Sequence, residues 1–284
     1  SGTWNENCTN SVLFEHHYTI GSGGYSEYKL NGKNFETDTC YEFLYGNKLI
    51  GYNPYKLKFY DLQFKNNHFE KIELTHLNQF ILEQAVFGTP IFKLGSGGVN
   101  ILMISGIHGN ELPSQLASLR LLNELINTKL ENTVYIIPFA APKATMNNER
   151  TLNSRDLNRS AHIKNSLSNL IMQAVDELDS NFVGDFHSTA KNSNPGFESV
   201  FSSRNPSPES CLIANYISAQ MGSKVISFEF AGKIYKGAVE DVCNLKGVPA
   251  ITGEVLSPFA LVGKGSAEKS LMQMKSFLSY FGIF

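Results

Sequence analysis

The stretch Val99-Asn-Ile-Leu-Met-Ile-Ser-Gly-Ile-His108-Gly-Asn-Glu111 decides the fold, because an apolar run stops and a histidine and a carboxylate follow at once. Residues 99–104 are too few for a lone helix and too apolar for a solvated edge, so they indicate a strand buried on both faces of a parallel sheet. Pro113 and the helical spacing of the leucines after it predict a helix over 113–130. His108 and Glu111 are therefore expected in a loop at the carboxyl end of a strand, where open α/β sheets place their sites.

This histidine and carboxylate suit a divalent metal. Imidazole nitrogen and carboxylate oxygen both bind zinc at about 2.0–2.2 Å, and a set of two His and one Glu leaves a fourth position open. A solvated pair at a helix start is the alternative as long as the pair stands alone. A metal site therefore requires a further ligand from elsewhere in the chain.

Composition excludes several classes of function. The 284 residues fit one main domain with a small additional module. Net charge is −2, with 24 basic and 26 acidic residues and no run of Lys or Arg, so neither a nucleic-acid groove nor a polybasic membrane patch is indicated. No apolar stretch reaches the ~18 residues of a membrane span. The composition predicts a soluble protein with no nucleic-acid partner and no membrane span.

The pattern divides the chain in two. Residues 1–77 carry short alternating runs, such as 41–45 and 56–60, separated by Gly and Pro, and they predict a small β-rich N-terminal extension or a set of edge strands. From residue 78 to 284 strands alternate with helices, which predicts an α/β catalytic domain with a mostly parallel mixed sheet and helices on both faces. The predicted strands are 91–94, 99–104, 134–139, 182–186, 224–230 and 248–254, and the predicted helices are 113–130, 164–179, 207–220, 237–246 and 265–281.

The four cysteines form no Cys-x-x-Cys pair, which argues against a structural zinc cluster. The sequential pairing, Cys8–Cys40 and Cys211–Cys243, would fit an oxidising compartment. The chain also begins with Ser, as it would after removal of a signal peptide. We therefore expect an exported protein, periplasmic, at the cell surface or secreted. Four free thiols in a cytoplasmic protein are the alternative.

Two later predicted strands also end in side chains that could bind a metal or transfer a proton. The strand over 182–186 leads into His187, and Asp185, two positions earlier on the same face, is placed to hold its ring. The strand over 248–254 ends in Glu254, where a general base is expected, and Gly253 is expected to leave room for substrate. Three strands that end in His, His and Glu indicate a shared site.

A long loop follows the strand over 134–139. It contains Arg150, Arg155 and Arg159 within ten residues. Guanidinium groups bind a carboxylate through two parallel hydrogen bonds, so these arginines are candidates to clamp an anionic group. The alternative is a solvated loop whose Arg–Asp pairs contribute little.

The order of these motifs resembles a known family. His108-x-x-Glu111, Asp156-Leu-Asn158-Arg159, Asp185-Phe-His187-Ser188 and Pro249-Ala-Ile-Thr-Gly-Glu254 resemble the motif series of the zinc carboxypeptidase superfamily, including its murein-peptide amidase and aspartoacylase/succinylglutamate desuccinylase branches. The resemblance covers residues 78–284. It implies one zinc ion per chain.

The resemblance also implies roles for individual residues. His108, Glu111 and His187 would bind the zinc, and Glu254 would be the general base that activates the attacking water. Arg150 would stabilise the oxyanion. Arg155 competes for that role, because the segment from Arg150 to Asn158 is about one residue shorter than in the relatives.

Substrate recognition is implied in the same way. Asn158 and Arg159 would grip the terminal carboxylate of the substrate, and Tyr235 lies where the family has a tyrosine that caps the substrate. The remaining pocket residues are expected in variable loops over 188–204 and 230–245.

The resemblance implies a zinc-dependent hydrolase that cleaves an amide bond next to a terminal carboxylate. The first reading is a metallocarboxypeptidase, with D,L-carboxypeptidase or amidase action on cell-wall (peptidoglycan) peptides as the substrate class. The second is a deacylase of N-acyl amino acids. A non-catalytic module that binds peptide or cell-wall polymer is the third, and loss of a ligand or of the base would favour it. None of these residues is lost.

Overall fold

The computed structural model describes residues 12–19, 25–30, 43–44 and 57–61, positions 78, 81, 84 and 85, and residues 88–284 except Asn127 and the side chain of Met146. In the N-terminal part, β1 (Val12–Thr19), β2 (Tyr25–Leu30) and β3 (Phe43–Leu44) form a three-stranded sheet in the order β2-β1-β3. Within the described residues no helix has both the length and the apolar character that a bilayer crossing requires.

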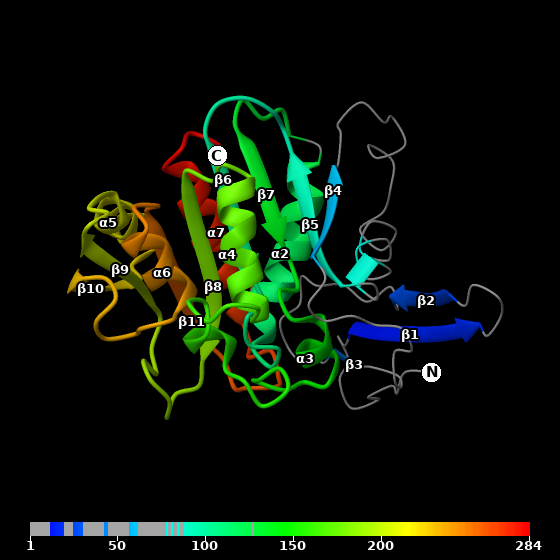
Figure 1. Cartoon of the computed structure of the whole chain (residues 1–284). Coiled ribbons are helices and arrows are strands. Elements are labelled where there is room, and N and C mark those ends of the chain that lie inside the picture. Colours follow the sequence, from blue (N-terminus) through cyan, green and yellow to red (C-terminus); the bar gives the residue numbers. More distant parts are fainter. Residues whose placement is uncertain are drawn as a thin grey trace.

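The main element is an eight-stranded sheet in the order β10-β9-β11-β8-β6-β7-β5-β4 (Figure 1). Five of its seven strand pairings are parallel, and β9–β11 and β5–β7 are antiparallel. This confirms the predicted mostly parallel mixed sheet. Its strands are β4 (Leu57–Asp61), β5 (Thr89–Leu94), β6 (Asn100–Ser105), β7 (Thr133–Ile137), β8 (Phe182–Thr189), β9 (Ser199–Asn205), β10 (Lys224–Phe230) and β11 (Ala250–Leu256).

The edge strand β4 comes from the part of the chain that the sequence assigned to the extension. It pairs in parallel with β5, so residues 57–61 contribute to the main sheet. The division at residue 77 remains a prediction.

Helices cover both faces of the sheet, as predicted (Figure 1). One face carries α2 (Leu112–Leu125), α5 (Glu209–Met221) and α7 (Ser266–Ser279). The other carries α3 (Pro142–Met146), α4 (Leu167–Glu177) and α6 (Val239–Leu245), and a short 3-10 helix, η2 (Leu157–Arg159), precedes α4.

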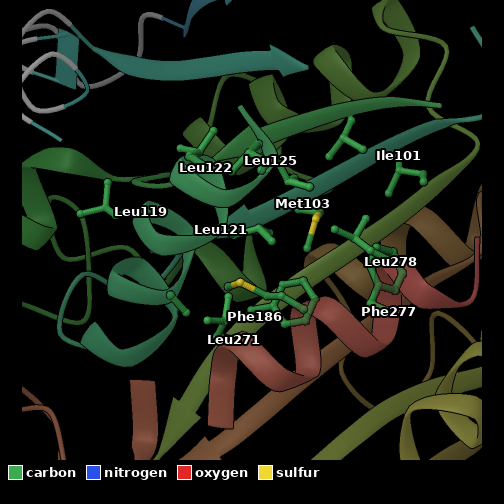
Figure 2. Close-up of a cluster of buried hydrophobic side chains, with 14 of the residues drawn as sticks. Ile101, Met103, Leu119, Leu121, Leu122, Leu125, Phe186, Leu271, Phe277 and Leu278 are labelled. Carbon is green, nitrogen blue, oxygen red and sulfur yellow. The ribbon is translucent and has the colours of Figure 1, made fainter. Parts of the chain in front are cut away.

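The strand β6 divides two hydrophobic cores. Because side chains alternate along a strand, Ile101 and Met103 point into the core with α2 and α7, whereas Leu102 and Ile104 point into the core with α4 and α6. Figure 2 shows the first of these cores, where Met103 lies between leucines of α2 on one side and Phe277 and Leu278 of α7 on the other. A strand buried on both faces fixes the position of the loop that leaves it.

Two predicted boundaries differ from the structure. The helix expected over 113–130 ends at Leu125, and the hydroxyl of Thr128 donates to the Glu124 carbonyl beyond this end. The strand expected over 182–186 continues to Thr189 because β11 pairs with it along that whole length, so His187 lies within β8.

The variable loop expected over 188–204 is wrong in its second half, because Ser199–Asn205 form β9 between β10 and β11. The serines of this strand hide its apolar pattern. Two of the three are accommodated in the sheet through hydrogen bonds: Ser202 Oγ lies 2.6 Å from Ser227 Oγ, and the Ser203 amide donates to Ser210 Oγ. The hydroxyl of the third, Ser199, is buried and has no hydrogen-bond partner among the described residues.

The predicted Cys211–Cys243 disulfide is wrong, since both thiols are free. The sheet separates them. Cys211 lies on α5, with its Sγ 3.2 Å from Ser227 Oγ, whereas Cys243 lies on α6 in the opposite core, with its Sγ 3.6 Å from Met172 Sδ. Cys8 and Cys40 lie outside the described residues.

Candidate active site

His108, Glu111 and His187 meet at the centre of the sheet. The first two lie in the loop between β6 and α2, and the third lies on β8, the neighbour of β6. One ligand atom from each lies within 4.8 Å of the others, and all three side chains are buried. His108 Nδ1 lies 2.5 Å from Glu111 Oε2, and His187 Nδ1 lies 3.0 Å from Glu111 Oε1.

The loop that carries the first two ligands is held tightly. A Cβ at Gly109 would lie 2.2–2.5 Å from backbone atoms of Ala144 and Thr145, so this position requires glycine. Gln115 donates to the carbonyls of Gly109 and Glu111, and Thr145 Oγ1 donates to its Oε1. The ligands are therefore positioned by buried neighbours before any metal binds.

A carboxylate holds the outer nitrogen of each imidazole ring. Asp156 Oδ1 lies 2.8 Å from His108 Nε2, and Asp185 Oδ2 lies 2.7 Å from His187 Nε2. Such partners fix the tautomer that keeps the hydrogen on Nε2, which leaves the Nδ1 lone pair for a metal. Two imidazoles oriented in this way around one carboxylate fit zinc, and the remaining coordination position stays open for water or substrate.

Electrostatics also favour a cation at this point. Burial by itself would raise the pKa of Glu111, but the two histidines beside it hold that pKa far below its usual range. Burial lowers the pKa of His187, whereas Asp185 and Glu111 raise it, and the net result lies well above the ordinary value. The carboxylates thus attract positive charge to the rings, and a bound metal would take the place of that proton.

Glu254 lies on β11 directly opposite His187 in the register with β8. Its Oε2 atom is enclosed and has no hydrogen-bond partner among the described residues. Burial raises the pKa of Glu254 to about 8, with Glu111 and Asp185 adding to the rise and His187 opposing it. An unpaired carboxyl group with a pKa near neutrality is suited to accept and return a proton.

The expected role of Gly253 is wrong. A Cβ there would lie 2.6 Å from Gln273 Oε1 and 2.9 Å from the Phe186 ring, so this glycine permits close packing against α7 rather than the approach of substrate. Gln273 Nε2 donates to the carbonyl of Glu254 from the same side. The C-terminal helix therefore supports the end of β11 from behind.

The structure separates the two candidate oxyanion residues. Arg150 lines the cavity and bridges the site, since its Nη1 lies 3.4 Å from Glu111 Oε2 and its Nη2 lies 3.1 Å from Asp156 Oδ2. Arg155 is exposed and does not line the cavity. A tight backbone pairing between Leu152 and Arg155 causes this difference, because it turns the chain between the two arginines.

Asn158, Arg159 and Tyr235 come together at the side of the cavity. The Arg159 guanidinium carbon lies 5.1 Å from the centroid of the Tyr235 ring, and Asn194 Nδ2 donates to the Tyr235 hydroxyl. Asn158 Oδ1 accepts from the amide of Val239 at the start of α6. The side-chain amide nitrogen of Asn158 makes no hydrogen bond within the described residues, so it is available to a ligand.

These side chains surround one cavity of about 410 Å³. It is also lined by Phe201, Glu240 and Thr252, which the sequence did not indicate. Glu240 looked like an ordinary acidic residue in the first turn of a helix, and nothing in the sequence distinguishes it from Asp241. Asp156 was quoted within a motif, but its role as the partner of His108 required the fold.

Glu240 is 4% exposed, and burial raises its pKa to about 8, with Asp241 adding to the rise. A folded-state pKa above the ordinary value of 4.5 means that the unfolded chain releases this proton first as pH rises. The free energy of unfolding should therefore decrease as pH rises from about 4.5 to about 8. We expect Glu240→Gln to match the wild type near pH 4 and to be more stable at pH 8 by on the order of 2–4 kcal/mol. Urea unfolding at both pH values measures this difference, and an equal difference at both would contradict the assignment.

Comparison with known proteins agrees with this site. The catalytic-domain profile of the succinylglutamate desuccinylase/aspartoacylase family matches residues 97–257, more than half of the 284 residues. This range includes all three candidate metal ligands and Glu254. Among curated proteins, none matches the sequence.

Solved structures share the fold. An aspartoacylase family protein from Mesorhizobium loti is 18% identical with a TM-score of 0.55, and the match covers 69% of this chain and 62% of that one. A metallo-carboxypeptidase from Burkholderia cenocepacia is 13% identical with a TM-score of 0.52, covering 68% and 60% of the two chains. The tripeptide-bound cell shape determinant Csd4 from Helicobacter pylori is 13% identical with a TM-score of 0.55, covering 69% and 56%.

This chain thus aligns with less than two thirds of the length of each of these three proteins. With its mixed sheet, its His-Glu-His cluster and the profile match over residues 97–257, the chain belongs to the succinylglutamate desuccinylase/aspartoacylase family.

Proposed function

We propose that this protein is a zinc-dependent hydrolase of the metallocarboxypeptidase type, which cleaves an amide bond next to a terminal carboxylate. The observation that carries the proposal is the position of Glu254. It lies opposite His187, beside the His-Glu-His cluster, in a cavity that also contains arginine side chains. Amide hydrolysis needs a metal, a base and a group that stabilises negative charge, and each has one candidate here.

The candidate metal ligands are His108, Glu111 and His187, and zinc held there would supply a Lewis acid for the scissile carbonyl and for water. Glu254 takes a proton from the attacking water and returns it to the leaving amine. Arg150 donates to the oxygen that becomes negative when water adds to the carbonyl carbon. Because Arg150 already spans Glu111 and Asp156, this donor is positioned before substrate arrives.

Recognition of the terminal carboxylate is assigned to Asn158 and Arg159. Arg159 lies exposed at the cavity, held by its contact with Tyr235 and by a 2.7 Å hydrogen bond from its Nη1 to the Asn158 carbonyl. A guanidinium held in this way offers its other nitrogens to a carboxylate. Tyr235 would then cover the bound residue.

Within this reaction class we favour peptides, including cell-wall peptides, as substrates. Deacylation of N-acyl amino acids is the second candidate, and the family profile match is the specific observation that favours it. The test is hydrolysis of purified peptidoglycan peptides, carboxylate-ended dipeptides and N-acyl amino acids side by side, with products identified by mass. Release of a terminal amino acid from peptides supports the first candidate, and cleavage of the N-acyl amino acids alone supports the second.

A substitution tests the carboxylate grip. Arg159→Lys keeps the charge but removes the two-pronged geometry, so we expect kcat/KM on carboxylate-ended peptides to fall by about 10–100-fold. Amidated peptides, which offer no carboxylate, should be poor substrates of the wild type. Equal wild-type rates on free and amidated ends would remove this role from Arg159 and indicate internal cleavage.

We also propose that the protein is exported. The disulfide argument for export now depends on Cys8 and Cys40 alone, which lie outside the described residues, because Cys211 and Cys243 form no disulfide. Locating the protein by fractionation of cells that express it is the direct test.

A further inference from the structure

A second carboxyl group in the cavity is left unused by the proposed chemistry. Glu240 is 4% exposed and lines the cavity. Its Oε1 accepts from Asn244 Nδ2 at 2.7 Å and from Ser203 Oγ at 3.4 Å. Its Oε2 has no hydrogen bond among the described residues and is not one of the fully enclosed unpaired atoms. One oxygen is therefore fixed by the protein, and the other is open to the cavity.

No cation of the described residues pairs with this carboxylate. The two arginines of the cavity have other partners: Arg150 bridges Glu111 and Asp156, and Arg159 contacts Tyr235 and the Asn158 carbonyl. A buried carboxylate without a positive partner is costly, so a ligand that brings a positive charge would gain from this position. The hydrogen bonds from Asn244 and Ser203 hold the carboxylate in place for such a ligand.

The position of Glu240 relates it to the carboxylate grip. Asn158 Oδ1 accepts from the amide of Val239, the residue directly before Glu240. The start of α6 therefore contacts Asn158, which is assigned to the substrate's carboxylate, and also carries Glu240. Asn158, Arg159 and Glu240 line the same cavity, so the side chain of an amino acid residue whose carboxylate lies at Asn158 and Arg159 would share that space with Glu240.

We propose that Glu240 is a specificity-determining residue, which selects substrates whose terminal residue carries a side-chain ammonium group, as in lysine, ornithine and other diamino acids. The inference rests on the proposed function and deepens it, because it names the substrate class of the same site. An acidic terminal side chain would bring a second carboxyl group beside Glu240 with no cation between the two. A neutral side chain would leave the carboxyl group without a partner.

The geometry favours ammonium over guanidinium. A guanidinium binds a carboxylate best when both oxygens accept at once, but Oε1 of Glu240 already accepts two hydrogen bonds. The remaining oxygen presents a point acceptor, which suits the compact charge of an ammonium group. Phe201 and Ala238 line the same cavity and provide apolar surface for the methylene stem of such a side chain.

The experiment compares lysine with norleucine, which differs mainly in lacking the ammonium group. Binding of the free amino acids, each as both enantiomers, is measured by calorimetry on the zinc-loaded protein, and hydrolysis is measured on dipeptides that end in them. The variants are Glu240→Gln and, as a matched control, Glu229→Gln, which removes an exposed carboxylate of β10 that pairs with Arg204. We expect the wild type and the control to prefer lysine by about 10–100-fold, and Glu240→Gln to lose at least a factor of ten of that preference while its norleucine values stay within a few-fold.

The two arms separate this inference from the proposed function. Tighter binding of lysine that depends on Glu240, without hydrolysis of any dipeptide, would support the recognition role and refute the proposed hydrolase. Equal binding of lysine and norleucine to the wild type, or a lysine preference unchanged in Glu240→Gln, would overturn the inference even if peptides are hydrolysed. Glutamine keeps the size of the side chain and is neutral, as Glu240 is below its raised pKa of about 8, so Glu240→Gln is expected to fold.

Discussion

Replacing Glu254 by glutamine is expected to lower kcat by about 10²–10⁴-fold while zinc content and folding stay intact. Glutamine preserves the shape of the side chain but cannot accept the proton from water. Glu254 makes no hydrogen bond through its enclosed Oε2, so the substitution breaks no described contact of that atom. Initial rates on the best substrate and zinc content per chain measure the effect.

The alternative is that Glu254 is structural and pairs with an arginine. Arg150, the candidate partner, instead contacts Glu111 and Asp156. The matched control is Glu268→Gln, which removes an exposed carboxylate in the first turn of α7. If Glu254→Gln keeps most of its activity and chiefly loses stability, Glu254 is not the base.

The second large effect is expected for the metal site. His187→Ala should bind no stoichiometric zinc and show only background hydrolysis, because two remaining ligands do not make a tight zinc site. Asp185→Asn retains the ligand but weakens the hold on its ring, so zinc affinity should fall by about 10–100-fold. Zinc affinity should also fall as pH falls, since the raised pKa of His187 means that a proton competes with the metal for its ring.

Calorimetric titration of zinc into chelator-treated protein tests these expectations. The wild type should take up one zinc ion per chain and regain activity with it. Full zinc stoichiometry in His187→Ala would place the metal elsewhere, and a wild type that stays inactive with zinc bound would separate the metal site from catalysis.

The central part of the fold was predictable from the sequence. Strands such as β6 and β8 are buried on both faces, so they appear as continuous apolar runs, and the carboxyl ends of parallel neighbours lie at one edge of the sheet. This is why His108, His187 and Glu254, far apart in the sequence, are expected to share one site, and the structure places His187 beside His108 and opposite Glu254. The roles of these residues in catalysis stay predictions.

Other features of the fold and the site could not be predicted, because they depend on contacts between residues far apart in the sequence. The pairing of β9 with β11 is antiparallel, and two serines of β9 become compatible with a sheet only through partners on other elements. The choice between Arg150 and Arg155 depended on a loop turn, and the place of Glu240 depended on how α6 packs against β9. Gly253 was misassigned because Gln273, some 20 positions later, occupies the space beside it.

The placement of the chemistry in the sheet has a consequence for how such proteins diversify. The candidate metal ligands and Glu254 belong to β8, β11 and the loop after β6, which are adjacent at the middle of the sheet. Glu240 and Tyr235 come instead from the helix and loop that follow β10. Substitutions after β10 can therefore accumulate without disturbing the residues at the middle of the sheet. Related proteins would therefore be expected to change their substrate through substitutions in segment 230–245 while the residues at the middle of the sheet stay the same.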